Sequence, residues 1–342
     1  MHVFLYEWIT GGGLVEEPSP LPASLLAEGS AMATAMAADL SAIENSKVTV
    51  LRDMRLDELA FPGCEVIEVH SSTDCFDEIE RLATAADYTL LIAPEFDNIL
   101  FNTVRHALQT EANLLTPSAK FVALTTNKHK TAKLLAEADI PVPKATLLAA
   151  DEEKLPADFD YPAVLKPVSG AGSQHTLLLA SSQDEPPTYP WPRRLEQFCP
   201  GIAASVAAIC GPVGRILLTP CRQTQSTDGR FAYRGGSLIH EPALIERAKL
   251  LADRTLDVLP PARGYVGIDL VLGNAGDGSE DLVIEVNPRL TTSYVGLRAA
   301  TKVNLAQVML DSAAGRSTDV PFRLDRLEFL ADGTILQATN NA

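Results

Sequence analysis

Two apolar segments near the C-terminal end of the chain carry acidic residues inside their hydrophobic runs. The segments YVGIDLVL (265–272) and DLVIEV (281–286) are joined by the turn-rich GNAGDGSE, a pattern that predicts an antiparallel hairpin. With the loop centred on Asp277, Asp269 and Glu285 lie opposite each other, with Cβ atoms about 5 Å apart. Two carboxylates so placed in an apolar sheet repel, and burying either one unpaired is costly. We therefore expect a cation between them.

Two further polar side chains continue the same face of the second strand. Asn287 follows Glu285 at a spacing of two residues, and Arg289 follows Asn287. The oxygens of Asp269, Glu285 and Asn287 form a hard, incomplete ligand set that favours Mg²⁺ or Mn²⁺, completed by water and phosphate oxygens, over zinc or iron. Arg289 could hold another phosphate or a carboxylate bidentately. The alternative is a solvated edge strand on which Arg289 neutralises Glu285, and the register match favours the metal site.

Two isolated lysines could counter the charge of a polyphosphate. Lys128 begins a predicted helix, and Lys166 ends the apolar strand AVLK just before the turn PVSGAGS. Lysine holds phosphate oxygens as a point charge, and free backbone N–H groups of the turn could cover the same phosphates. Taken singly, each lysine is more often a solvated surface charge. The pattern GxxxxGK[ST] is absent, so the chain is not a P-loop protein.

The first third of the chain alternates short apolar runs with helical patterns. HVFLYEW, KVTVL, EVIEV and YTLLIAPE predict strands with helices between them, which indicates an open parallel α/β sheet. Ligands of such sheets bind beyond the carboxyl ends of the strands, where Glu7 and the glycines at 11–13 fall. These glycines could form a ligand-facing loop or a purely structural turn. Glu7, Gly12 and Gly13 are therefore candidate substrate residues.

The charge balance and the termini narrow the class of protein. Lysine and arginine number 28 against 44 for aspartate and glutamate, and the net charge of −16 argues against nucleic acid as a partner. The five cysteines contain no CxxC pair, which favours free thiols in a reducing compartment. The start MHVFLYEWIT lacks the features of a signal peptide, and no apolar run approaches the ~20 residues of a membrane span. We expect a cytoplasmic protein without a membrane partner.

Several segments occur in an order and approximate spacing that resemble the ATP-grasp ligases. They are NKHKTAKLLAEADIPVP, YPAVLKPVSGAGS, LEQFCPG, GIDLVL and VIEVNPR, within about residues 117–315. The resemblance implies an ATP-grasp fold, in which a small lid and a core antiparallel sheet hold ATP, preceded by an open parallel α/β domain. The expected division is 1–116 for the pre-ATP-grasp domain, 117–195 for the lid subdomain and 196–342 for the core subdomain.

The resemblance also implies roles for individual residues. The lysines would contact the phosphates, the segment LEQF the adenine, and the hairpin residues two Mg²⁺ ions, with Arg289 and Lys166 as the catalytic candidates. The family usually has an acidic residue near position 203 or 204 for the ribose hydroxyls, and both positions are alanine here. The implied nucleotide and metal residues are Lys128, Lys166, Glu196, Gln197, Phe198, Asp269, Glu285 and Asn287.

A narrower resemblance concerns the two ends of the chain. FLYEWITGGG and NPRLTTSYVGLR resemble the tyramine-glutamate ligases of methanofuran biosynthesis, a part of one-carbon metabolism. This implies that ATP phosphorylates the γ-carboxylate of glutamate and that tyramine, or a related amine such as tyrosine, attacks the acyl phosphate. The expected partners are therefore a small-molecule carboxylate and a small-molecule amine. Further candidate substrate residues are Thr291, Thr292, Ser293, Arg222 and Arg234, although the two arginines also suit a solvated loop.

Other functions remain open from the sequence alone. A different ATP-grasp reaction, such as ligation of two amino acids or phosphorylation of a small alcohol, would use the same residues. A non-catalytic ATP-binding module would suit the alanines at 203 and 204, but it would not need both metal carboxylates. We expect a homodimer, although no heptad or exposed apolar stripe identifies its interface.

Overall fold

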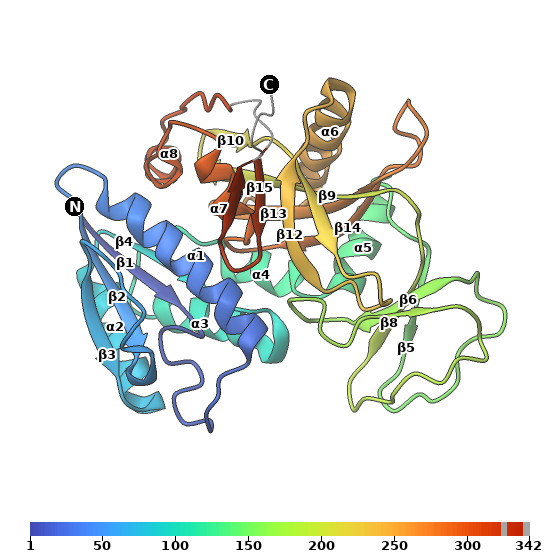
Figure 1. Ribbon diagram of the computed structural model, residues 1–342, viewed down its shortest axis with the longest axis horizontal. Coiled ribbons are helices and arrows are strands. Elements are labelled where there is room, and N and C mark those ends of the chain that lie inside the picture. The colour runs from blue at the N-terminus through green and yellow to red at the C-terminus, as the bar shows by residue number, and fades with distance from the viewer. Residues whose placement is uncertain (323–326, 338–342) are drawn as a thin grey trace.

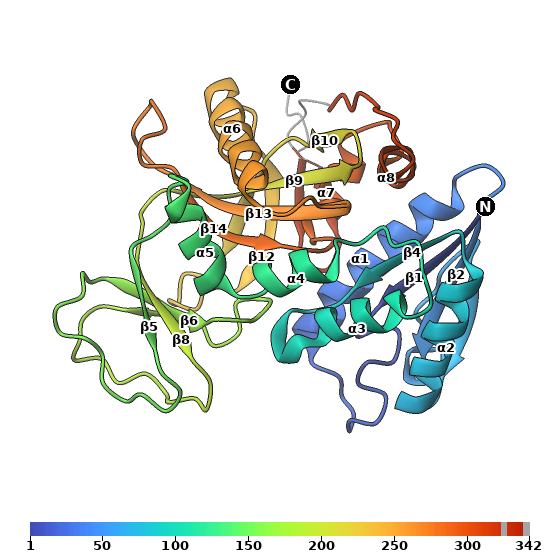
Figure 2. The same cartoon turned by 180° about the vertical axis from the view of Figure 1, so that it is seen from behind.

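The computed structural model of the protein describes residues 1–322 and 327–337, and its first sheet is parallel (Figure 1). The strand order is β3-β2-β1-β4, with helix α1 on one face and helices α2 and α3 on the other (Figure 2). The elements are β1 (His2–Glu7), α1 (Ala23–Ser41), β2 (Lys47–Asp53), β3 (Glu65–Val69), α2 (Ser72–Ala85), β4 (Tyr88–Ile92) and α3 (Ile99–Leu108), with 3₁₀ turns at Met54–Leu56 and Phe96–Asn98. The predicted open parallel α/β domain is confirmed.

Strand β1 carries the first candidate residue to an edge of this sheet. Val3–Tyr6 are buried along the whole run, because helices cover both faces of the sheet and leave no polar face. Glu7 is the last residue of β1 and pairs with Ile92 of β4. It therefore stands at the carboxyl edge of the parallel strands, where ligands of such sheets bind.

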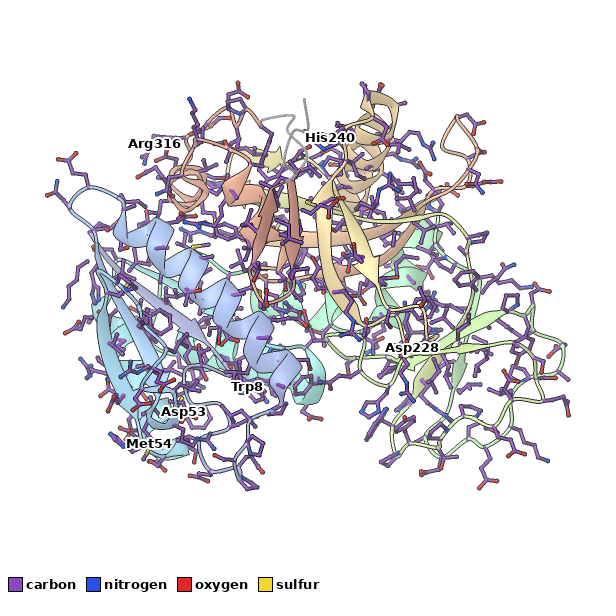
Figure 3. All side chains as sticks on the ribbon, in the orientation of Figure 1. Trp8, Asp53, Met54, Asp228, His240 and Arg316 are labelled. Atoms are coloured by element: carbon purple, nitrogen blue, oxygen red, sulfur yellow. The ribbon has the colours of Figure 1, made fainter. Side chains whose placement is uncertain are left out.

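The glycine-rich turn after β1 is required by packing. Gly12 has a φ of +97°, which favours glycine. A Cβ atom on Gly13 would lie 2.1 Å from the indole nitrogen of Trp8, so no side chain fits there. Trp8 and Asp53 both lie at this edge of the domain (Figure 3). The backbone N–H of Asp53 donates to the Thr10 carbonyl at 2.7 Å. The turn thus has a structural explanation.

The second sheet is small and antiparallel, with strand order β5-β8-β6-β7. Its strands are β5 (Ala145–Leu148), β6 (Ala163–Pro167), β7 (Leu177–Leu179) and β8 (Arg193–Gln197). The predicted boundary at 195/196 falls inside β8, which belongs as a whole to this lid sheet. The preceding helices α4 (Ala119–Thr125) and α5 (Lys128–Glu137) contact β14 of the third sheet. The division into three units itself stays a prediction.

The third sheet forms the core and is antiparallel, with strand order β14-β13-β9-β11-β12-β15-β16 and β10 beside β9. Val206 and Ala208 of β9 pack with helix α6, whereas Ala207 and Ile209 pack with α8, because successive side chains of a strand alternate between faces. The elements are β9 (Ile202–Gly211), β10 (Gly214–Leu217), β11 (Cys221–Gln225), β12 (Tyr233–Leu238), α6 (Pro242–Val258), β13 (Gly264–Leu272), β14 (Leu282–Asn287), α7 (Ser293–Ala299), α8 (Leu305–Ala313), β15 (Leu327–Leu330) and β16 (Ile335–Gln337). The ATP-grasp-like architecture expected from the sequence is observed.

Helix α1 joins the N-terminal domain to the core sheet. It lies beside α7 and α8 and contacts both helices (Figure 1). The buried side chains between these helices belong to one hydrophobic core. At the polar edge of this contact, Asp39 accepts hydrogen bonds from Arg298 Nε at 2.9 Å and from the Tyr294 hydroxyl at 2.6 Å. These contacts place the start of α1, with Glu28 and Gly29, at a defined position beside the core. Within the described ranges, no helix has the length and apolar character needed to cross a membrane.

We expect Gly29→Ala to destabilise the protein although alanine favours helices. A Cβ atom at this position would lie 2.4 Å from Ile9 Cγ2 and 2.8 Å from both Glu7 carboxylate oxygens. Overpacking of this kind costs about 1–3 kcal/mol, against a helix-propensity gain of about 1 kcal/mol. Urea unfolding measures the difference, with Gly276→Ala as the control because its Cβ would enter open space. Equal stability of the two variants would contradict the packing of Glu7 against α1.

Candidate active site

A cavity of about 340 Å³, here called the main cavity, lies between the lid sheet and the core sheet. Its walls come from β6 and the turn after it, from the end of β8, and from β9, β11, β13 and β14. Elements far apart in the sequence therefore meet here. The predicted residues that line it are Lys128, Lys166, Glu196, Gln197, Phe198, Asp269, Glu285, Asn287, Arg289, Thr291, Thr292 and Ser293.

Four candidate substrate residues line neither of the two cavities described here. Gly12 and Gly13 lie in the packed turn after β1. Arg222 approaches the Glu241 carboxylate at 3.5 Å, and Arg234 is exposed on β12. Both arginines thus fit the solvated alternative. The structure brings none of the four to the main cavity.

Asp269 and Glu285 are paired across β13 and β14, as the hairpin register predicts. A bulge beside Asp269 shifts the register, so that Leu270 pairs with Val283 while Asp269 still meets Glu285. Burial and the Glu285 carboxylate raise the pKa of Asp269. Burial would also raise the pKa of Glu285, but Lys128 and Lys166 outweigh it and lower that pKa. The two carboxylates therefore differ in pKa, because the two lysines act mainly on Glu285.

Three neighbouring side chains direct their N–H groups at the carboxylates of Asp269 and Glu285. Lys128 Nζ lies 2.7 Å from Glu285 Oε2. The Asn287 amide nitrogen donates to Asp269 Oδ2 at 3.0 Å, and the Gln223 amide nitrogen donates to Asp269 Oδ1 at 2.9 Å. Sequence reasoning missed Gln223, whose only signal is its place on the cavity face of a short polar strand.

The residues present fit a divalent cation. Asp269, Glu285 and Asn287 offer oxygen ligands, and Lys128 compensates one of the two half-buried carboxylates, which leaves a negative charge in excess. Within residues 1–322 and 327–337, no group of three or more His, Cys, Asp or Glu side chains is gathered that could hold a metal. A metal here would therefore depend on the amide and on ligands from outside the protein.

Lys166 belongs to a second buried charge network. Its Nζ lies 2.5 Å from Glu196 Oε1, and Arg194 Nε lies 2.8 Å from Glu196 Oε2. Two cations on one carboxylate leave this wall of the cavity with a positive charge in excess. His129 adds a ring nitrogen 3.3 Å from Arg194 Nη1. The network and the acidic pair therefore present opposite charges to the main cavity.

The segment expected to meet the adenine is partly engaged within the sheet. The N–H of Gln197 donates to the Lys144 carbonyl at 2.9 Å, and that of Phe198 donates to the Pro162 carbonyl at 3.0 Å. The Glu196 side chain is held by the network described above. In the described part of the chain, the N–H of Cys199 makes no hydrogen bond, and Cys199 lines the main cavity. Sequence reasoning did not single out this backbone donor.

Arg289 links the core to the N-terminal domain. Its Nε and Nη2 donate to the two carboxylate oxygens of Glu95 at 2.9 and 3.0 Å, and its Nη1 donates to the Leu290 carbonyl at 3.1 Å. A guanidinium has five N–H donors, so two remain beyond these contacts of the described residues. Glu95 follows β4 in the segment APEFDN, and sequence reasoning did not assign it a role. It orients the guanidinium from another domain.

Glu7 lines a smaller cavity that adjoins the main one. Its carboxylate accepts hydrogen bonds from the N–H groups of Ile9 and Thr10 at 3.3 and 2.8 Å. Burial, only partly offset by these bonds and by Arg289, raises the pKa of Glu7 to about 7. Among the residues that the structure describes, no cation pairs directly with the Glu7 carboxylate.

We expect Glu7→Gln to alter stability in a pH-dependent way. Between its usual pKa of 4.5 and about 7, the folded protein retains a proton that the unfolded chain has lost, so wild-type stability falls as the pH rises through this window. Glutamine does not titrate, so the stability of the variant does not fall in this pH window. Its unfolding free energy relative to wild type should therefore increase by about 3 kcal/mol from pH ~5 to pH ~8.

Urea unfolding at the two pH values measures this change. Glu58→Gln, which alters an exposed glutamate of the same domain, is the control. A stability difference between Glu7→Gln and wild type that stays constant with pH would contradict a buried, uncompensated carboxylate.

Two family models match the chain in succession. A model described as a pre ATP-grasp 3 domain matches residues 46–122, and one described as an ATP-grasp domain matches residues 125–293. The second match includes the main-cavity residues from Lys128 to Ser293. Together the two matches extend over well more than half of the chain.

Relatives and solved structures agree with these matches. The chain is 23% identical over 330 residues to a tyramine--L-glutamate ligase of Methanocaldococcus fervens, covering 96% of this chain and 98% of the relative. It is 22% identical over 333 residues to the protein of the same name from Methanocaldococcus jannaschii, covering 96% and 94%. The crystal structure of a putative ATP-grasp superfamily protein from Archaeoglobus fulgidus matches with a TM-score of 0.72 and 22% identity, covering 96% and 92%. The chain therefore belongs to the ATP-grasp superfamily, with a pre-ATP-grasp domain ahead of its ATP-grasp domain.

Proposed function

We propose that the protein is an ATP-dependent carboxylate–amine ligase, with the γ-carboxylate of glutamate as donor and tyramine, or a related amine such as tyrosine, as acceptor. The observation that carries this proposal is the opposed pair Asp269 and Glu285 facing Lys128, Lys166 and Arg289 in one cavity. An acidic pair beside three cations suits a metal-bound polyphosphate and a second anion. The names of the two relatives support the choice of substrates.

The proposed reaction has two steps. A carboxylate oxygen of the donor attacks the γ-phosphorus of ATP, the bond to the β-phosphate oxygen breaks, and ADP leaves. The neutral amine then attacks the acyl phosphate, the C–N bond forms as the C–O bond to phosphate breaks, and the amine nitrogen loses a proton. Both steps need a site that neutralises phosphoryl charge and keeps water from the intermediate.

The residues of the main cavity suit these tasks. Lys128 and Lys166 would bind phosphate oxygens in place of the carboxylates that hold them now. Arg289, already oriented by Glu95, would direct its two remaining N–H donors at the transferring phosphoryl group. Asp269, Glu285 and Asn287 would hold Mg²⁺ or Mn²⁺, in the expected number of two ions, which supplies charge neutralisation of the phosphates.

One feature favours a second candidate function, that of a non-catalytic ATP-binding module. Ala203 lines the main cavity, and Ala204 beside it is buried, where an acidic residue was expected from the resemblance. A non-catalytic module would bind ATP without turnover, and another ATP-grasp reaction would turn over with different substrates. The same assay separates all three.

The test is ADP release by the purified protein with Mg²⁺ and ATP, with glutamate present and with tyramine or tyrosine added or omitted. We expect ADP to accumulate only when both glutamate and an amine are present, and the product mass to equal that of their amide. ATP binding without ADP release on any of these substrates would contradict the proposed ligase.

We expect Glu285→Gln to reduce turnover by a hundredfold or more, on the order of the losses seen when one charge-stabilising group is removed. The fold should survive, because glutamine keeps the shape of the side chain and relieves the repulsion with Asp269. Steady-state ADP release and thermal unfolding measure the two effects. Glu246→Gln, on the exposed face of α6, is the control. Turnover of Glu285→Gln close to that of the control would refute the assigned role.

A further inference from the structure

A cavity of about 40 Å³, here called the side cavity, adjoins the main cavity on the side of the N-terminal domain. The two share Glu28, Ala171, Gly172 and Arg289 in their walls. Ala171 and Gly172 belong to the turn after β6, so the lid sheet, the core and the N-terminal domain all contribute to the side cavity. A group bound there would lie next to the site proposed for the phosphoryl transfer.

The side cavity is small, and most of its wall is apolar. Its volume leaves room for about three or four groups the size of a water molecule, since one such group needs roughly 10–15 Å³. The carbon walls exclude a fully hydrated ion. The apolar and small side chains of the wall are Trp8, Ile9, Leu25, Gly29, Met32, Ile92, Ala93 and Pro94.

Two carboxylates face this cavity with too little positive charge to balance them. They belong to Glu7 and Glu28. Arg289 is the one cationic side chain in the wall among the residues described, and two of its donors are taken by Glu95. Burial raises the pKa of Glu7 and also that of Glu28, as expected for carboxylates whose charge is not fully compensated.

The chain is shaped to hold these carboxylates in place. Gly29, near the start of α1, leaves room for Glu7, because a Cβ atom there would lie 2.8 Å from both carboxylate oxygens. The N–H groups of Ile9 and Thr10 fix the orientation of Glu7. Glu28 accepts one hydrogen bond in the described part of the chain, from the Thr292 hydroxyl at 3.2 Å. Both carboxylates keep lone pairs for a further donor.

The chemistry of the wall selects among cations. Mg²⁺ and Ca²⁺ need about six or more oxygen ligands, and a wall of two carboxylates among carbon atoms does not supply them. A primary ammonium group needs only about three acceptors, and its carbon chain suits apolar walls. An α-amino acid would bring its own carboxylate beside Glu7 and Glu28, which like-charge repulsion disfavours.

We propose that the side cavity binds the ammonium group of the acceptor, and that this acceptor is a primary amine without an α-carboxylate. The inference rests on the proposed ligase function and narrows it to amines of the tyramine type over amino acids such as tyrosine. Glu7 and Glu28 are the residues that bind the ammonium group, and one of these carboxylates accepts a proton from it, because only the neutral amine attacks the acyl phosphate. The turn at Ala171 and Gly172 encloses it beside the acyl phosphate.

Steady-state kinetics of Glu28→Gln and Glu7→Gln test this inference, with tyramine varied at saturating ATP and glutamate. Loss of a hydrogen bond to a charged group predicts a KM for tyramine raised about ten- to a hundredfold, with the KM values of ATP and glutamate unchanged. Glu58→Gln is the matched control. Thermal unfolding of all variants checks that the fold is kept. A rise in the KM of glutamate instead of tyramine would overturn the assignment in favour of the donor's own ammonium group.

Hydroxylamine separates this inference from the proposed function. It is neutral near pH 7, so it can trap the acyl phosphate as γ-glutamyl hydroxamate without an ammonium site. We expect Glu28→Gln and Glu7→Gln to lose efficiency with tyramine by a much larger factor, relative to wild type, than they lose hydroxamate formation. Hydroxamate formation by wild type with an unchanged KM for tyramine in both variants would refute the side-cavity assignment alone. Failure of wild type to form ADP or hydroxamate from glutamate would refute the ligase function itself.

The wild-type protein alone tests whether the acceptor lacks an α-carboxylate, through a comparison of tyramine with tyrosine. The value of kcat/KM for tyramine should exceed that for tyrosine by at least about tenfold, because the tyrosine carboxylate would face two like charges. Equal efficiency, or a preference for tyrosine, would overturn the claim that the acceptor lacks an α-carboxylate.

Discussion

The repulsion between two half-buried carboxylates, Asp269 and Glu285, determines how the main cavity is built. Their strands pair so that the two side chains meet, and the bulge beside Asp269 keeps them together. In a low-dielectric interior this charge has to be compensated, and Lys128 together with the amides of Gln223 and Asn287 turns toward it. A site of this kind accepts a cation readily, because binding removes a repulsion that the fold already carries.

The N-terminal domain is part of the same electrostatic arrangement. Glu95 holds Arg289 of the core by two hydrogen bonds, and Thr292 of the core donates to Glu28 of α1. The contact of α1 with α7 and α8, with Asp39 at its edge, keeps these partners in register. The domain therefore does more than precede the ATP-grasp domain, since it orients a core arginine, contributes Glu28 to the main cavity and forms most of the wall of the side cavity.

Local patterns predicted the parts of the site that depend on strand geometry. Alternation and loop length correctly predicted that Asp269 and Glu285 are opposed, but they did not predict the bulge that shifts the register between this pair and the loop. Lys128 and Lys166 could be chosen because their flanking motifs were distinctive. Arg222 and Arg234 had no distinctive flanking motif. They lie outside the two cavities, where an arginine side chain on a polar strand is stable in contact with water. The segment 196–198 was expected to offer backbone N–H groups to the adenine. The N–H groups of Gln197 and Phe198 instead donate to carbonyl groups of the lid subdomain.

By itself, the sequence determined the alternation of strands and helices, the two acidic positions of the hairpin and the glycine turn, because these depend on periodicity and local sterics. Only the tertiary structure decided that Arg289 pairs with Glu95, 194 residues away, and that Gln223 reaches Asp269. It also placed Glu28 and Glu7 around one small cavity. The physical reason is that charge compensation acts through space, so its partners are set by how the three sheets pack and leave no trace in local sequence.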